Sequence, residues 1–126
     1  MPDNAATILI CDDEPTLREL MRISLPPMYS FAEAADAAEA IELVDQVRPD
    51  LVLLDVMMPG ASGLTVLERL RGDAQLSDTP VLVISAFSAE SDRLAALDAG
   101  ATGFLKKPFD PEELELLVEE LLAARN

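Results

Sequence analysis

Positive charge is scarce in this sequence. Its 126 residues contain 9 Lys and Arg against 24 Asp and Glu, so the formal net charge is −15 at pH 7. Proteins that bind nucleic acid directly depend on Lys and Arg to neutralise phosphates, and anionic membrane surfaces attract basic segments for the same reason. The charge balance therefore argues against nucleic acid and against a membrane as direct partners.

Cysteine and long apolar runs are also scarce. No apolar run approaches the roughly 18–20 residues of a membrane-spanning helix, and no signal peptide is expected. The single cysteine, Cys11, cannot form an internal disulfide. Because it lies in an apolar run, we expect a buried, reduced thiol rather than a metal ligand, and hence a cytoplasmic protein. Hydrophobic residues still make up 50% of the chain, which excludes a disordered acidic protein.

Strand-like apolar runs alternate five times with amphipathic helical patterns. This alternation predicts right-handed βαβ crossovers and a doubly wound α/β fold, with a five-stranded parallel sheet and helices on both faces. No linker, repeat or low-complexity segment interrupts it, so we expect a single domain over 1–126 with a core at about 7–122. Strands are expected at about 7–11, 29–34, 51–55, 81–84 and 103–106, and helices at about 15–25, 36–47, 64–71, 88–99 and from 111 onward.

The first and last helices have distinct surface patterns. Arg18 and Arg22 are expected to face outward from the first. Asp110 and Pro111 are typical of a helix start. Leu116 lies among glutamates, away from the apolar stripe of the last helix, and is either an ordinary exposed leucine or an anchor for a partner or a second protomer. The stripe itself, expected to face the core, consists of Leu114, Leu117, Val118 and Leu121.

Three aspartates follow two of the predicted strands. Asp12 and Asp13 close the apolar run at 8–11, and Asp55 closes the run at 51–54. The carboxyl ends of parallel neighbouring strands lie at one edge of a sheet, so the three carboxylates are expected to converge. Like charges about 4 Å apart repel by roughly 4 kcal/mol at an effective dielectric near 20. The cluster therefore needs a cation, and Mg²⁺ with its oxygen ligands fits a metal-assisted phosphoryl site.

Two more side chains are expected at this edge. Ser85 follows the run at 81–84. Lys107 follows the last strand and precedes Pro108, and a residue before proline is held extended, which suits a side chain directed at a fixed point. Simpler interpretations stay open: the aspartates could cap helices, Ser85 could be an ordinary strand-end hydroxyl, and Lys107 could be only a salt-bridge partner.

With these residues in place, the sequence closely resembles the response-regulator receiver domain of two-component signalling over essentially all of 7–122. The matching segments are Cys11–Pro15, Asp55–Gly60 with Gly63, Ser85–Ala86 and Lys107–Phe109. The resemblance implies the flavodoxin-like (βα)5 fold with sheet order 2-1-3-4-5.

The resemblance also implies an activity. Asp55 would accept a phosphoryl group from the phosphohistidine of a histidine kinase or phosphotransfer protein. Asp13, Asp55 and the backbone carbonyl of Met57 would bind Mg²⁺, and Asp12 would contribute through ordered water. The protein would then be a phospho-acceptor rather than a turnover enzyme.

The remaining motif residues would stabilise the phosphoryl group and report its presence. Lys107 would neutralise its charge and Ser85 would donate to one of its oxygens. Phe104 matches the switch aromatic that turns inward when Ser85 moves, but phenylalanine has no hydroxyl to report the state by hydrogen bonding. The Lys107–Pro108 peptide would be cis. The output would be a changed surface for a downstream effector protein, for an attached output domain or for a phosphorylation-dependent homodimer.

The resemblance also bears on how long the phosphorylated state lasts. Met57 and Phe87 would border the approach of hydrolytic water, and since neither can orient water, a long-lived phosphorylated state is expected.

Two other functions remain as alternatives. One is a phosphorylation-independent pseudo-receiver that acts only as an interaction module. The other is a haloacid-dehalogenase-like phosphatase, although Glu14 stands where its first motif requires aspartate. A flavodoxin-type cofactor site is disfavoured because three consecutive acids in the first loop would repel phosphate.

Overall fold

The computed structural model describes residues 6–58, 62–86 and 89–124. In this part of the chain, five parallel strands form one sheet in the order β2-β1-β3-β4-β5, as predicted. The strands are β1 (Thr7–Cys11), β2 (Ser30–Ala34), β3 (Leu51–Leu54), β4 (Val81–Ser85) and β5 (Gly103–Lys106). The helices are α1 (Pro15–Ser24), α2 (Ala37–Val47), α3 (Leu64–Arg71), α4 (Glu90–Asp98) and α5 (Pro111–Ala124).

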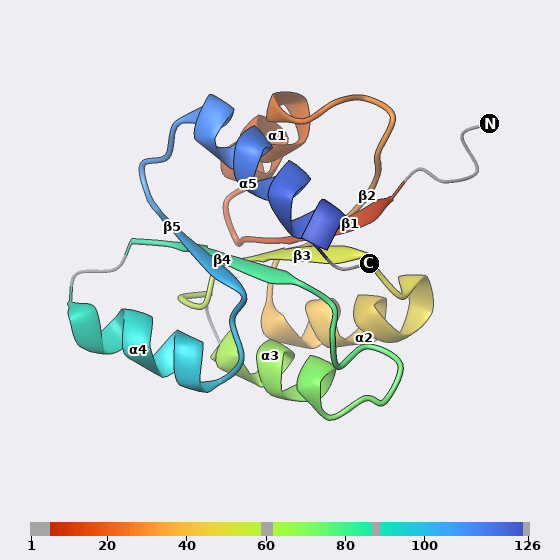
Figure 1. The fold of residues 1–126 in the computed structure, drawn as a ribbon, viewed down its shortest axis with the longest axis vertical. Helices are drawn as coiled ribbons and strands as arrows, with labels where there is room; N and C mark the ends of the chain where they lie inside the picture. The colour runs from red at the N-terminus through yellow and green to blue at the C-terminus, as the bar shows by residue number, and fades with distance from the viewer. Residues whose placement is uncertain (1–5, 59–61, 87–88, 125–126) are drawn as a thin grey trace.

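Helices cover both faces of the sheet. Helices α1 and α5 lie on one face, and α2, α3 and α4 lie on the other (Figure 1). The three inner strands are buried on both sides because alternate residues contribute to two separate core clusters. In β3, for example, Leu51 and Leu53 belong to the α1/α5 cluster, whereas Val52 and Leu54 belong to the other.

The sequence located the elements to within a few residues, and the differences lie at their ends. Ser85 is the last residue of β4 rather than the residue after it, and β3 stops at Leu54, so that Asp55 begins a loop. Helix α5 starts where its residues predict, because the Asp110 carboxylate accepts a hydrogen bond of 2.9 Å from the backbone N–H of Glu112. Among the described helices, none is long and apolar enough to cross a membrane.

The prediction of an outward-facing side chain on α1 is wrong for Arg18, whereas the Arg22 side chain stays 39% exposed. The Arg18 side chain is only 17% exposed, and both guanidinium groups pair with Glu33 of β2. A helical pattern could not reveal this pairing, because the arginines and the glutamate meet only when β2 forms the edge of the sheet beside β1.

Arg71, at the end of α3, joins the loops that precede β4 and β5. Its guanidinium donates to the backbone carbonyls of Ser77, Thr79 and Gly100 at 3.1, 2.7 and 2.7 Å. Gly100 has a φ of +112°, and a Cβ there would lie 2.9 Å from the Arg71 side chain. Burial lowers the pKa of Arg71. The guanidinium thus acts as a clamp: it donates to three uncharged backbone carbonyls at once and holds the two loops together.

We expect Arg71→Met to destabilise the fold by about 2 kcal/mol, because partly buried carbonyls would lose their donor while the apolar stem of the side chain is retained. Urea unfolding measures this loss. Arg48→Met is the matched control: Arg48 pairs with Asp73 at the surface, and exposed ion pairs stabilise little. Equal unfolding midpoints for the two variants would contradict the clamp.

Candidate functional site

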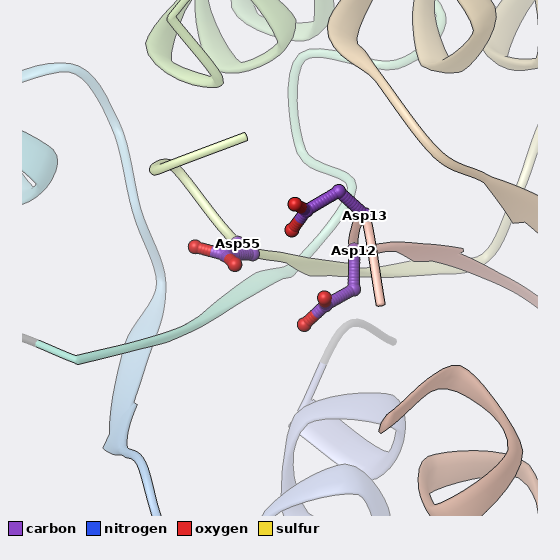
Figure 2. Close-up of side chains that lie close together, drawn as sticks. All are labelled: Asp12, Asp13 and Asp55. Atoms are coloured by element: carbon purple, nitrogen blue, oxygen red, sulfur yellow. The ribbon is translucent and has the colours of Figure 1, made fainter. Parts of the chain in front are cut away.

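The carboxyl ends of β1 and β3 bring the three predicted aspartates together. Cys11 pairs with Leu54 in the ladder, and the backbone N–H of Asp55 donates to the carbonyl of Cys11 at 2.9 Å. Asp12, Asp13 and Asp55 each offer a carboxylate oxygen within 4.8 Å of the others. Figure 2 shows the three side chains gathered where the two strands end. The predicted convergence is confirmed.

Lys107 reaches this cluster from the end of β5. Its Nζ lies 2.7 Å from Asp12 Oδ2 and 2.9 Å from Asp55 Oδ2. Burial lowers the pKa of Lys107, but the hydrogen bonds and charges of the two aspartates outweigh burial and raise the pKa overall. Lys107 therefore stays protonated and bridges two of the three carboxylates. The cis peptide predicted between Lys107 and Pro108 is present.

Asp55 is held by donors on both of its oxygens. Oδ1 accepts a hydrogen bond from the Ser85 hydroxyl at 3.1 Å and one from the backbone N–H of Met57 at 2.9 Å. Oδ2 accepts from Lys107. Ser85 is fully buried and Asp55 is 5% exposed, so Ser85 is not an ordinary strand-end hydroxyl: its one side-chain hydrogen bond in the described part of the structure goes to this carboxylate.

The two adjacent aspartates differ in their surroundings. Asp12 is fully buried, and its oxygens accept from the backbone N–H of Glu14 at 2.9 Å and from Lys107. Asp13 is exposed, so solvent and a cation can reach its carboxylate. This contrast fits the division in which Asp13 binds a metal directly and Asp12 acts through water.

The donor set fits a hard divalent cation. Three carboxylates and one lysine leave a net charge near −2, and carboxylate oxygens are the ligands that Mg²⁺ prefers. Met57 contributes its N–H to Asp55, and its side chain is exposed; the ligand role of its carbonyl stays a prediction. Phe87 lies outside the described residues, as do Pro59 and Gly60 of the matching motif, so the predicted approach of hydrolytic water stays untested.

Phe104 lies on β5, beside β4, which carries Ser85. It pairs in register with Val83 and packs at the edge of the core on the α4 side of the sheet. The Arg93 guanidinium carbon of α4 lies 5.6 Å from the centre of its ring, and Arg93 also pairs with Glu90. Cation–π contacts of this kind are attractive. The sequence analysis missed Arg93, because a contact between α4 and β5 has no local signal.

Gly63 brings α3 against the loop that carries Asp55. Its N–H donates to the Val56 carbonyl at 3.2 Å. A Cβ on this glycine would lie 2.6 Å from Val56 Cα and 2.8 Å from the Asp55 carbonyl oxygen. Both are backbone atoms, so the loop would have to move. Only glycine allows this close approach.

Sheet order, acid cluster, serine and lysine together define the class of protein, and comparison with known proteins identifies its family. Residues 8–119 match the response regulator receiver domain. The chain belongs to this family, whose members are switched by phosphorylation in two-component signalling.

The chain is similar to curated response regulators that are about twice its length. Response regulator MprA of Mycobacterium sp. (strain KMS) is 46% identical over 116 residues, which are 91% of this chain and 50% of MprA. The DNA-binding dual master transcriptional regulator RpaA of Synechocystis sp. is 40% identical over 116 residues, or 91% of this chain and 48% of RpaA. The chain therefore spans about half the length of these curated relatives.

Solved structures of similar size show the same fold. A putative response regulator from Chloroflexus aurantiacus superposes with a TM-score of 0.84 at 33% identity, covering 94% of this chain and 98% of that one. The chemotaxis response regulator CheY4 of Vibrio cholerae superposes with a TM-score of 0.84 at 28% identity, covering 93% and 98%.

We expect Gly63→Ala to displace the Asp55–Val56 backbone and so to lower both stability and Mg²⁺ affinity. Urea unfolding and calorimetric titration with Mg²⁺ measure the two effects. Gly72→Ala is the matched control, since its Cβ would come no closer than 3.3 Å to a carbonyl oxygen at the end of α3. If both alanine variants bind Mg²⁺ like the wild type, the close approach at Gly63 has no bearing on the site.

Proposed function

We propose that Asp55 is the phosphoryl acceptor of this receiver, and that Mg²⁺ held by Asp13, Asp55 and the Met57 carbonyl assists transfer from a phosphohistidine. One observation carries the assignment. Of the three clustered carboxylates, only that of Asp55 accepts hydrogen bonds from both Ser85 and Lys107. The donor would be a histidine kinase or a phosphotransfer protein.

The contacts of Asp55 fit this reaction. A carboxylate oxygen attacks phosphorus, the O–P bond forms, and the P–N bond breaks with its electron pair returning to the imidazole. Lys107, already 2.9 Å from Oδ2, offsets negative charge on the arriving group, and Ser85, 3.1 Å from Oδ1, can turn its hydroxyl to a phosphoryl oxygen. When bound, Mg²⁺ supplies further positive charge beside that group.

A groove beside the acids supports a protein donor. It runs between α1 and the segment after β5 and is largely apolar, so an amphipathic helix that carries the phosphohistidine could dock there within reach of Asp55. Its lining residues are Leu17, Leu20, Ala86, Lys107, Pro108 and Phe109.

The wider setting is also a proposal. The chain forms one receiver domain with its core at about 7–122 and works in the cytoplasm, in keeping with the free, buried thiol of Cys11. A downstream effector or an attached output domain reads its state, as the name of the DNA-binding relative RpaA suggests. The pseudo-receiver alternative predicts no phosphoryl transfer, and the phosphatase alternative predicts repeated turnover of a phosphate ester.

Incubation with Mg²⁺ and acetyl phosphate should add one acid-labile, hydroxylamine-sensitive phosphoryl group to the protein, and Asp55→Asn should reduce labelling to background. The asparagine keeps the shape of the side chain but lacks the nucleophilic oxygen pair. Intact-protein mass spectrometry measures the product. Asp45→Asn, an exposed site on α2, is the control and should label fully. Full labelling of Asp55→Asn would refute the assignment, and an unlabelled wild type would favour the pseudo-receiver.

Asp13→Asn should weaken Mg²⁺ binding more than Asp12→Asn does. Asp13 is the exposed, direct ligand, whereas both oxygens of Asp12 are held by Glu14 N–H and Lys107. For Asp12→Asn we expect a loss of about tenfold, the lower end for outer-shell partners. Calorimetric titration measures the Mg²⁺ affinity of the two variants. Equal affinities would contradict direct binding by Asp13 and water-mediated binding by Asp12.

Leu116→Ala should weaken phosphorylation-dependent association while leaving folding and phosphorylation intact. Leu116 is 60% exposed among the glutamates of α5, whereas the predicted stripe of that helix packs inward. Sedimentation of the phosphorylated proteins, with pull-down of an effector, measures the effect. Ile23→Ala is the control, because Ile23 is also well exposed, at 69%, but lies on α1. If Leu116→Ala and the wild type associate alike, Leu116 is only a surface residue.

A further inference from the structure

Arg18 connects the acidic loop to the edge strand β2. Its Nη1 donates to the backbone carbonyl of Asp12 at 2.6 Å, and its Nε donates to Glu33 Oε1 at 2.9 Å. The second oxygen of Glu33 pairs with Arg22. The Arg18 side chain is only 17% exposed. It reaches from α1 to two acceptors, the Asp12 carbonyl and the Glu33 carboxylate, and because the guanidinium is planar, its two hydrogen bonds have a fixed relative direction.

The carbonyl that Arg18 holds is the one that joins Asp12 to Asp13. A peptide unit is planar, so the direction of this carbonyl also fixes the N–H and Cα of Asp13. The rest of Asp12 is already fastened: its N–H donates to the Ala34 carbonyl at 3.0 Å, and its carboxylate is held by Glu14 and Lys107. The peptide after it therefore links a buried, firmly held aspartate to an exposed one, and Arg18 holds the carbonyl of that peptide.

We propose that Arg18, oriented by Glu33, is a positioning residue for the Mg²⁺ site. By fixing the peptide plane between Asp12 and Asp13, it holds the Asp13 carboxylate in the place from which it binds the ion. The inference rests on the proposed Mg²⁺ site but concerns residues that touch neither the ion nor the phosphoryl group. Outer-shell contacts of this kind orient metal ligands.

The charge of Arg18 and its positioning role predict opposite effects of Arg18→Met on Mg²⁺ affinity. A guanidinium near the site repels Mg²⁺, so if only its charge mattered, Arg18→Met would bind Mg²⁺ more tightly. If Arg18 positions Asp13, the same variant binds more weakly, because the loop must be ordered by the ion. Arg22 is the matched control, since it shares Glu33 but makes no described contact with the Asp12 carbonyl.

The test is calorimetric titration of the unphosphorylated proteins with Mg²⁺. We expect Arg18→Met to weaken binding by about tenfold, and Arg22→Met to bind as tightly as the wild type or more so. Arg18→Met combined with Glu33→Ala should bind no more weakly than Arg18→Met alone, since Glu33 acts through Arg18. Wild-type or tighter binding by Arg18→Met would overturn the proposal.

A second variant, Arg18→Lys, separates the effect of the guanidinium geometry from that of the positive charge. It also keeps the proposal testable if Arg18→Met fails to fold. Arg18→Lys keeps the charge and the stem, but one ammonium cannot reproduce the two-nitrogen fork. We expect it to bind Mg²⁺ more weakly than the wild type, and wild-type affinity would overturn the positioning role. Thermal unfolding of each variant tests whether the domain is still folded.

A Mg²⁺-free measurement distinguishes the failure of this inference from the failure of the proposed function. In Arg18→Lys, the backbone amide of Glu14 should exchange hydrogen faster than in the wild type, because its bond to Asp12 Oδ1 depends on an ordered loop. Unchanged exchange together with unchanged affinity would refute the positioning role alone. A wild type that binds no Mg²⁺ would refute the proposed metal site itself.

Discussion

Mutual repulsion among three carboxylates is the constraint on which the rest of this structure depends. Asp12, Asp13 and Asp55 bring oxygens within 4.8 Å of one another. The sheet holds the carboxylates at this distance, and nearby cations offset the repulsion between them. Lys107 supplies one positive charge from the far edge strand and thereby ties the ends of β1, β3 and β5 together. The residual negative charge fits the binding of a divalent cation with oxygen ligands.

The fold holds the carboxylates close together because the strands and loops around them are fixed by packing and hydrogen bonds. Buried strands fix where Asp12 and Asp55 emerge, and the lack of a side chain at Gly63 lets α3 pack closely against the loop that carries Asp55. Arg18 performs a similar task on the other loop by holding a carbonyl. Pre-organised groups of this kind cost no rearrangement when the ion or the phosphoryl group arrives.

The same strands lead from the site to the surface. Ser85 ends β4 against Asp55, and two residues earlier Val83 pairs with Phe104 on β5. Arg93 of α4 lies over the Phe104 ring. Ser85 therefore lies only a few backbone positions from the surface formed by α4 and β5, where the Phe104 ring contacts Arg93.

The sequence by itself determined the strand order by resemblance, the burial of the strands by their apolar runs, and the convergence of Asp12, Asp13, Asp55, Ser85 and Lys107. The burial and the convergence follow from local rules, because a polar residue directly after a short apolar run lies at the carboxyl end of a strand, whereas the strand order rested on the resemblance. Only the tertiary structure decided how Arg18, Arg71 and Arg93 are used. Each arginine meets partners from another element, and a long side chain that looks solvent-exposed on its own helix becomes a clamp only when the neighbouring strand or loop is in place.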